Sequence, residues 1–228
     1  DSLVGTFASV NLDKSVHSIT IDLGQGEYDS FVSYVGTSET FAPALKIMAD
    51  DTESDSDYLN LGSGNYSTVA YGGEFESVDW SGHADDFVFD ARPSIANRVH
   101  VFKDYSGKIT IVDETDIGET ITSINAPTES LIINTGYNAP YTNEYIHVGE
   151  DPDGTIRGMG ALNGDLIIDA GKLNKNLDGE DSVVIYSDIT LPGHKLEITS
   201  ENITINDGVT VSTSSSTGYA GDINLTGF

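Results

Sequence analysis

The residues of this chain that are best suited to chemistry are carboxylates, and they gather in short segments. Asp51, Glu53, Asp55 and Asp57 alternate with Thr and Ser in one acidic run. In an extended backbone these side chains lie on one face, about 6.6 Å apart in succession. Such spacing suits Ca²⁺, which takes about six to eight hard oxygen ligands. The run lacks the glycine and the terminal Glu of an EF-hand, so a calcium site and a solvated acidic loop are both open interpretations.

Two compact acidic turns are further candidates for the same ion. One contains Asp151 and Asp153, and the other contains Asp178, Glu180 and Asp181, each beside a glycine. Backbone carbonyls in such turns can complete a calcium shell. Asp-Gly and Pro-Asp pairs are also ordinary turn formers. Calcium is therefore the cofactor that the sequence predicts, with plain turn chemistry as the alternative.

Aromatic side chains offer a second kind of chemistry, the stacking of rings on sugars. Trp80 is the single tryptophan, and Tyr137, Tyr141 and Tyr145 recur every four residues. On a loop, these rings can form a glycan-binding platform. On a strand, they would form a stripe on one face of the core or the surface.

The residues of acid–base and transition-metal chemistry are scattered. No His-x-x-x-His or comparable spacing joins the five histidines, which are His17, His83, His100, His147 and His194. Asp85 and Asp86 follow His83 closely, and Arg98 and Lys103 belong to a small basic cluster. Catalysis requires such groups at defined separations in a pocket. We expect the chain not to be an enzyme, and keep a polysaccharide lyase or hydrolase that uses these residues as an alternative.

Charge and composition limit the classes of partner that this chain can bind. The 228 residues include 37 Asp and Glu against 10 Lys and Arg, a net charge of −27, and no cysteine. This charge argues against nucleic acids and anionic membranes as partners, and the lack of cysteine excludes disulfides and thiolate sites. No apolar run is long enough for membrane insertion. Ambient salt or bound divalent cations would relieve the self-repulsion, so we expect an extracellular or cell-surface location.

The elements that must position these residues are predicted to be strands. Apolar and polar residues alternate with a period of two, and turn residues bound each run. From Gly164 onward, short β runs follow one another: Leu166–Asp169, Ser182–Tyr186, Lys195–Thr199, Asn202–Ile205, Val209–Ser212 and Asp222–Leu225. The octets Leu23–Ser30 and Leu61–Thr68 share the pattern L-G-x-G-x-Y-x-S/T at an offset of 38 residues. We predict an all-β parallel solenoid with about 20 residues per coil, with β-sandwich domains as the alternative.

One segment carries a resemblance to a known family. Residues 202–227 comprise two short strands, a Ser/Thr tract and the closing run Gly218-Tyr-Ala-Gly-Asp-Ile-Asn-Leu. This segment resembles the repeats of large bacterial exoproteins of the filamentous-haemagglutinin type. The resemblance implies a right-handed parallel β-helix in a secreted adhesin or matrix protein. The two octets are more loosely similar to the repeats of RTX-type giant adhesins, but Tyr28 and Tyr66 replace the Asp that would bind calcium in those turns.

The predicted organisation is one elongated solenoid segment of a longer secreted chain, residues 1–228. A subdivision into an irregular β region, 1–157, and regular coils, 158–228, is compatible with the pattern. The expected function is structural or adhesive, in a fibre, sheath, surface layer or giant adhesin, with neighbouring copies or repeats of the same protein as partners. Surface polysaccharide is a further expected partner, since a calcium-dependent carbohydrate-binding module is the first alternative function.

Overall fold

The computed structural model is all-β. It describes residues 17–22, 30–32, 44–48, 58–62, 65–72, 77–80, 82–90, 98–115, 118–135, 143–170 and 180–227, and none of these residues is helical. Consequently, no described segment is a helix that could cross a membrane. The predicted fold class is confirmed at the level of all-β architecture built from parallel and mixed sheets.

The first sheet contains eight strands, every neighbouring pair of which is parallel. Its strands, in spatial order, are β1 (Ser18–Asp22), β3 (Ala44–Met48), β5 (Asn65–Gly72), β7 (His83–Asp90), β11 (Ser130–Asn134), β14 (Asp165–Asp169), β17 (Leu196–Thr199) and β20 (Ile223–Thr226). The spatial order is the order along the chain, so each new strand is added beside the previous one.

The second sheet contains nine strands and is mixed. Its spatial order is β2 (Ser30–Val32), β4 (Tyr58–Gly62), β6 (Ser77–Trp80), β10 (Gly118–Ile124), β9 (Ile109–Thr115), β8 (Arg98–Lys103), β12 (Tyr145–Val148), β15 (Ser182–Ile185) and β18 (Asn202–Ile205). All of its pairs are parallel except the two that involve β9.

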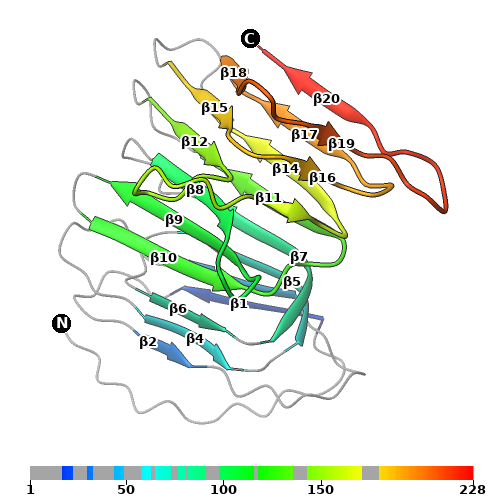
Figure 1. Cartoon of the computed structure of the whole chain (residues 1–228). Helices are drawn as coiled ribbons and strands as arrows, with labels where there is room; N and C mark the ends of the chain where they lie inside the picture. The colour runs from blue at the N-terminus through cyan, green and yellow to red at the C-terminus, as the bar shows by residue number, and fades with distance from the viewer. Residues whose placement is uncertain are drawn as a thin grey trace.

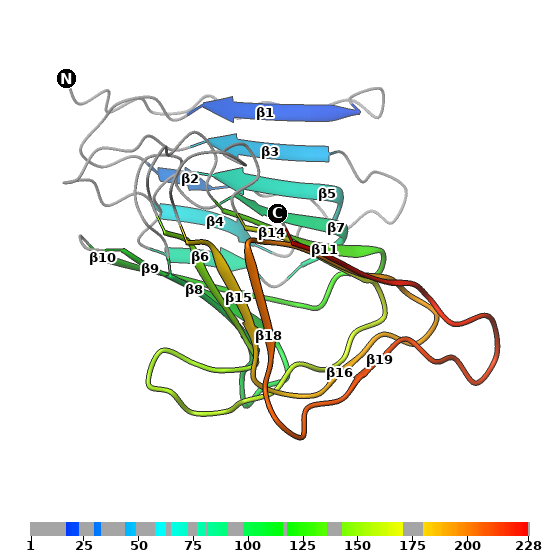
Figure 2. The same cartoon turned by 90° about the horizontal axis from the view of Figure 1, so that it is seen from above.

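A third, short parallel sheet is formed by β13 (Gly160–Ala161), β16 (Ile189–Thr190) and β19 (Val211–Ser212). From β11 onward the chain visits the first, second and third sheets in turn and then returns to the first. In Figure 1 the strands of the first sheet follow one another in colour from blue β1 to red β20, so strands that are consecutive in this sheet are neighbours. Seen from above, β18, β19 and β20 follow one another along three sides of a triangle (Figure 2).

The alternation between sheets is interrupted once, by the antiparallel meander β8–β9–β10. β10 pairs with β6 and β8 pairs with β12, both in parallel, while β9 lies between them in the opposite direction. The turn from β8 to β9 is fixed by Asp104, whose Oδ1 accepts hydrogen bonds from the N–H groups of Ser106 at 2.8 Å and Lys108 at 3.0 Å. Gly107 occupies the left-handed region there, with a φ of 84°, which favours glycine.

The core lies between the sheets and is built from columns of similar side chains. Leu131, Leu166 and Leu196 stack on consecutive strands of the first sheet, and all three are buried. Every second residue of these strands faces the core, as the period of two predicts. Trp80 is the largest side chain in the core; its ring stacks on Phe87 and meets Tyr66 edge to face.

The predicted coil length of about 20 residues is wrong as a general repeat. Paired residues in the first sheet are 18 positions apart between Thr68 and Asp86, but 44 apart between Asp86 and Ser130, because the meander is inserted there. The two matching octets also do not mark equivalent positions. The first ends at Ser30, which begins β2 of the second sheet, whereas the second ends at Thr68 in β5 of the first sheet.

Gly221 is the position where the last coil depends most on the lack of a side chain. A Cβ atom there would overlap the backbone carbonyl of His194, whereas a Cβ at Gly218 would make only an ordinary contact with Ser215. The close approach lets Leu196 N–H donate to the carbonyl of Asp222 at 2.9 Å, which attaches β20 to β17.

We therefore expect Gly221→Ala to detach β20 while the rest of the chain stays folded. Hydrogen exchange of the β20 amides should accelerate at least about tenfold, since the terminal coil then opens locally. Gly218→Ala is the matched control and should leave their exchange unchanged. Equal protection of β20 in both variants would contradict the close approach.

Candidate functional site

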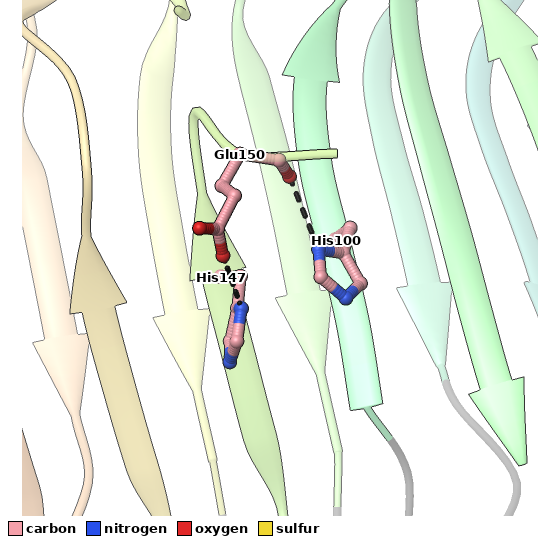
Figure 3. Close-up of side chains that lie close together, drawn as sticks. All are labelled: His100, His147 and Glu150. Carbon is pink, nitrogen blue, oxygen red and sulfur yellow. Dashed lines mark hydrogen bonds and ion pairs between the residues drawn. The ribbon is translucent and has the colours of Figure 1, made fainter. Parts of the chain in front are cut away.

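Three side chains, from two neighbouring strands and the turn after one of them, converge on the outer face of the second sheet (Figure 3). His100 lies on β8, His147 lies on β12, and Glu150 follows the end of β12. Each offers one nitrogen or oxygen atom, and these atoms all lie within 4.8 Å of one another. Within the described residues, this is the only group of His, Cys, Asp or Glu side chains with such geometry.

The strand register places the two histidines side by side. His147 is the direct partner of His100 in the parallel pair β8–β12, and their rings are 4.6 Å apart between centroids. Their neighbours Val99, Val101, Ile146 and Val148 point into the core, so the period of two turns both imidazoles outward.

A tight turn brings Glu150 over the histidines. Gly149 has a φ of 88°, and its N–H donates to the carbonyl of Val101 at 2.7 Å. A side chain at this position would also collide with Ser187. The chain therefore bends immediately after β12, and the Glu150 carboxylate folds back toward His147, as Figure 3 shows.

Both ring nitrogens of His100 face oxygen atoms. Nδ1 lies 3.1 Å from the backbone oxygen of Glu150, and Nε2 lies 3.5 Å from the Glu114 carboxylate on β9. The side chain of His100 is only 3% exposed, and Nε2 is a buried atom without a hydrogen bond. Glu114 also lies 3.8 Å from the guanidinium of Arg98, which is largely exposed.

His147 is held between Glu150 and Tyr186. Its Nδ1 lies 2.8 Å from Oε2 of Glu150, and its ring is 5.2 Å from that of Tyr186. Burial lowers the pKa of His147, with further lowering by His100 and Arg98, although Glu150 acts in the opposite direction. Burial and the neighbouring Glu150 carboxylate raise the pKa of Tyr186, which hydrogen-bonds to that carboxylate. The neutral imidazole favoured here is the form that binds metal ions.

The acidic turn predicted around Asp151 and Asp153 is stabilised by its own residues. Asp151 is buried; its carboxylate accepts a hydrogen bond from Thr155 N–H at 2.8 Å and another from Arg157 Nε at 2.6 Å. Burial alone would raise the pKa of Asp151, but these hydrogen bonds and the Arg157 charge outweigh it and lower the pKa. Arg157 thus places a positive charge beside Asp151, which the sequence predicts as a calcium ligand. Asp153 is exposed at the tip of the turn.

The second acidic turn is described only from Glu180 onward, and Asp178 lies outside the described residues. Glu180 is exposed, whereas Asp181 is buried and accepts a hydrogen bond from Glu144 N–H at 3.0 Å. Asp181 N–H in turn donates to Glu201 at 3.2 Å. Glu144, Asp181 and Glu201 immediately precede β12, β15 and β18, which are neighbouring strands, so these residues form an acidic column along the second sheet. Burial raises the pKa of Asp181, and Glu201 adds to the rise.

The remaining predicted residues do not come together in the described structure. Asp51, Glu53, Asp55, Asp57, Tyr137 and Tyr141 lie outside the described residues. The prediction of Trp80 as a glycan platform is corrected by its burial, because a ring 2% exposed in the core cannot stack on a sugar. Tyr145 is half-buried on β12, and its hydroxyl accepts a hydrogen bond from Asn143 Nδ2 at 3.3 Å.

The groups considered for a lyase or hydrolase lie on different sheets. Asp85 and Asp86 belong to β7 of the first sheet, and their carboxylates accept hydrogen bonds from Thr128 and Ser130. Arg98 and Lys103 belong to β8 of the second sheet. The best-formed recess in the described part of the chain, beside Pro127, Leu131 and Leu162, is too small to admit a water molecule.

The sequence analysis missed the cluster of His100, His147 and Glu150 because it compared histidines by linear spacing. A usable signal existed in the local pattern. Val99-His100-Val101 and Ile146-His147-Val148 are both apolar-His-apolar runs, typical of strands with an outward histidine. Aligning these two strands would have placed the histidines side by side.

Comparisons with known proteins do not place the chain in a family. A scan against protein families, a search of curated proteins and a search of solved structures each found no match. The arguments about function therefore depend on the geometry and charge of this chain.

The acidic column yields a prediction that opposes the calcium interpretation. The folded-state pKa of Asp181 is raised. Ionisation of this carboxyl therefore lowers the free energy of unfolding as pH rises above about 3.9, the pKa of Asp in an unfolded chain. Asn at this position keeps the acceptor for Glu144 N–H and can donate to Glu201. We expect Asp181→Asn to raise the melting temperature at pH 7 by about 3 °C.

The higher melting temperature of Asp181→Asn should vanish at about pH 3, because the Asp181 carboxyl of the wild type is then protonated in both the folded and the unfolded state. Asp153→Asn is the control for the change of net charge, since Asp153 is exposed. A lower melting temperature of Asp181→Asn in millimolar Ca²⁺ would instead support the predicted calcium site.

Proposed function

We propose that the chain is a structural and adhesive segment of an extracellular fibre, sheath, surface layer or giant adhesin, built as a right-handed parallel β-solenoid. The cyclic order of the chain through three sheets supports the solenoid. So does the parallel pairing between successive coils. Right-handed crossovers are the rule for parallel strands in one sheet.

This proposal rests mainly on the last three strands, which expose apolar side chains and contain no charged residue. Ile205, Ile223 and Leu225 occupy core columns, yet they are 42%, 45% and 44% exposed. The strands of this coil, β18, β19 and β20, contain no charged residue, although 21% of the chain is charged. Edge strands that face water usually carry charges or prolines that prevent pairing. This edge lacks such protection and suits another coil stacked on it.

A second copy or a further repeat of the same protein is the occupant that fits this edge. Parallel strands with free N–H and C=O groups pair with strands of the same direction and spacing. At the opposite end of the first sheet, β1 pairs only with β3 among the described residues. Contact between β20 of one copy and β1 of the next is heterologous, and heterologous contacts that do not close produce filaments.

The charge supports an extracellular or cell-surface setting. At −27, copies repel one another in dilute buffer, whereas at the salt concentration of sea water the repulsion is screened within a few ångströms. Calcium at the acidic run 51–57 remains part of this proposal as an additional means of neutralisation. No observation on the described residues specifically favours a carbohydrate-binding module or a lyase as the function of this chain.

The test is self-association of the 228-residue chain at high salt. Sedimentation velocity in about 1 M NaCl, where the Debye length is about 3 Å, should show oligomers that grow with protein concentration. Leu225→Lys places a charge in the exposed core column of β20 and should weaken association at least about tenfold. Thr217→Lys is the matched control, because Thr217 is exposed in the preceding loop and the change in charge is identical.

Oligomers in the wild type and in Thr217→Lys, with monomers in Leu225→Lys, would support the proposal. A monomeric wild type at all salt concentrations would contradict it, and so would equal association of both variants. Electron microscopy of the oligomers distinguishes open filaments from closed rings.

A further inference from the structure

His100 is a buried histidine on the outer face of the second sheet, and its side chain is only 3% exposed. Its two ring nitrogens each face an oxygen atom, the carbonyl of Glu150 at 3.1 Å and the carboxylate of Glu114 at 3.5 Å. Nε2 is buried and makes no hydrogen bond. A buried imidazole whose hydrogen-bonding capacity is not filled by the protein is a candidate ligand for a cation.

The neighbours of His100 are suited to hold such a cation. The nitrogen of a second imidazole, His147, and an oxygen of Glu150 lie within 4.8 Å of the ligand atom of His100 and of each other. Glu114 brings a second carboxylate to the same face. Arg98 is the nearest fixed positive charge, but it contacts Glu114 rather than the histidines and is 57% exposed.

We propose that His100, His147 and Glu150 bind one divalent transition-metal ion of the zinc type. Two imidazoles and one carboxylate are ligands of Zn²⁺, Ni²⁺ or Cu²⁺ and not of Ca²⁺, which prefers oxygen alone. This site differs from the acidic segments predicted to bind calcium and does not depend on the proposed self-association.

The geometry requires only a small contraction to form the site. Ligand atoms of a tetrahedral zinc ion lie about 3.3 Å apart, given bonds of about 2.0–2.1 Å. His147 and Glu150 are 19% and 14% exposed, so both side chains have room to rotate toward the buried His100. A water molecule takes the fourth position.

The position of the site indicates what the ion does. It connects β8, β12 and the turn after β12, which are separate steps of the stack held together otherwise by backbone pairing. β8 is also the outer strand of the meander. The ion would therefore fasten the insert to the coil that follows it.

The test is titration of the metal-free 228-residue chain with ZnCl₂ by calorimetry, with Co²⁺ as a spectroscopic probe of coordination. We expect one ion per chain, a tetrahedral Co²⁺ spectrum and a higher melting temperature with Zn²⁺. His147→Gln and Glu150→Gln should each weaken binding about 100-fold or more. These side chains are partly exposed, so both variants should keep the circular dichroism spectrum of the wild type.

The matched control is His194→Gln. His194 lies 3.6 Å from Asp165 near β17 and is the remaining His–carboxylate pair outside the cluster in the described part of the chain. Its loss should not change the affinity for Zn²⁺. The proposal is overturned if binding is not saturable, or if His194→Gln weakens it as much as His147→Gln does. It is also overturned if Zn²⁺ does not bind to the folded wild-type chain.

Discussion

In-register parallel pairing is the constraint on which the other features of this chain depend. Each residue of a parallel strand lies directly beside its counterpart on the neighbouring strand, about 4.8 Å distant. The size, polarity and charge of each side chain must therefore be compatible with those of the side chain at the same position on the neighbouring strand. The leucine column Leu131–Leu166–Leu196 makes a continuous core in this way. The same pairing places His147 against His100 and creates the candidate site from two residues 47 positions apart.

Such pairing is demanding for a chain that is so acidic, because like charges at this spacing repel. Two carboxylates of the first sheet show how this conflict can be avoided. Asp86 is bonded by the hydroxyl of Ser130 and Asp90 by the amide of Asn134, each on the next strand of the first sheet. Polar neutral partners thus separate the charges. The column Glu144–Asp181–Glu201 lacks this alternation; burial raises the pKa of Asp181, and the Glu201 charge adds to the rise.

The sequence predicted the regular part of the fold well and the irregular part poorly, for identifiable reasons. All six β runs predicted after Gly164 correspond to strands, β14, β15, β17, β18, β19 and β20, because alternation and turn residues agree there. The inserted meander was not predicted, since antiparallel and parallel strands have the same period of two. The matching octets were misleading because they end in strands of different sheets, Ser30 in the second and Thr68 in the first. Asp151 was assigned to calcium because its partner Arg157 is visible only once the turn is folded.

The meander is also the part of the chain where we expect folding to begin. Its strands are joined by short turns: Lys103 pairs with Ile109, and Thr115 pairs with Gly118. In contrast, Ser130 must find Asp86 across 44 residues. Closing a short loop costs less entropy and is faster than closing a long one. β8, β9 and β10 therefore form the natural nucleus, and its two outer edges are templates for β12 on one side and β6 on the other. Folding then spreads along the stack in both directions from the middle of the chain.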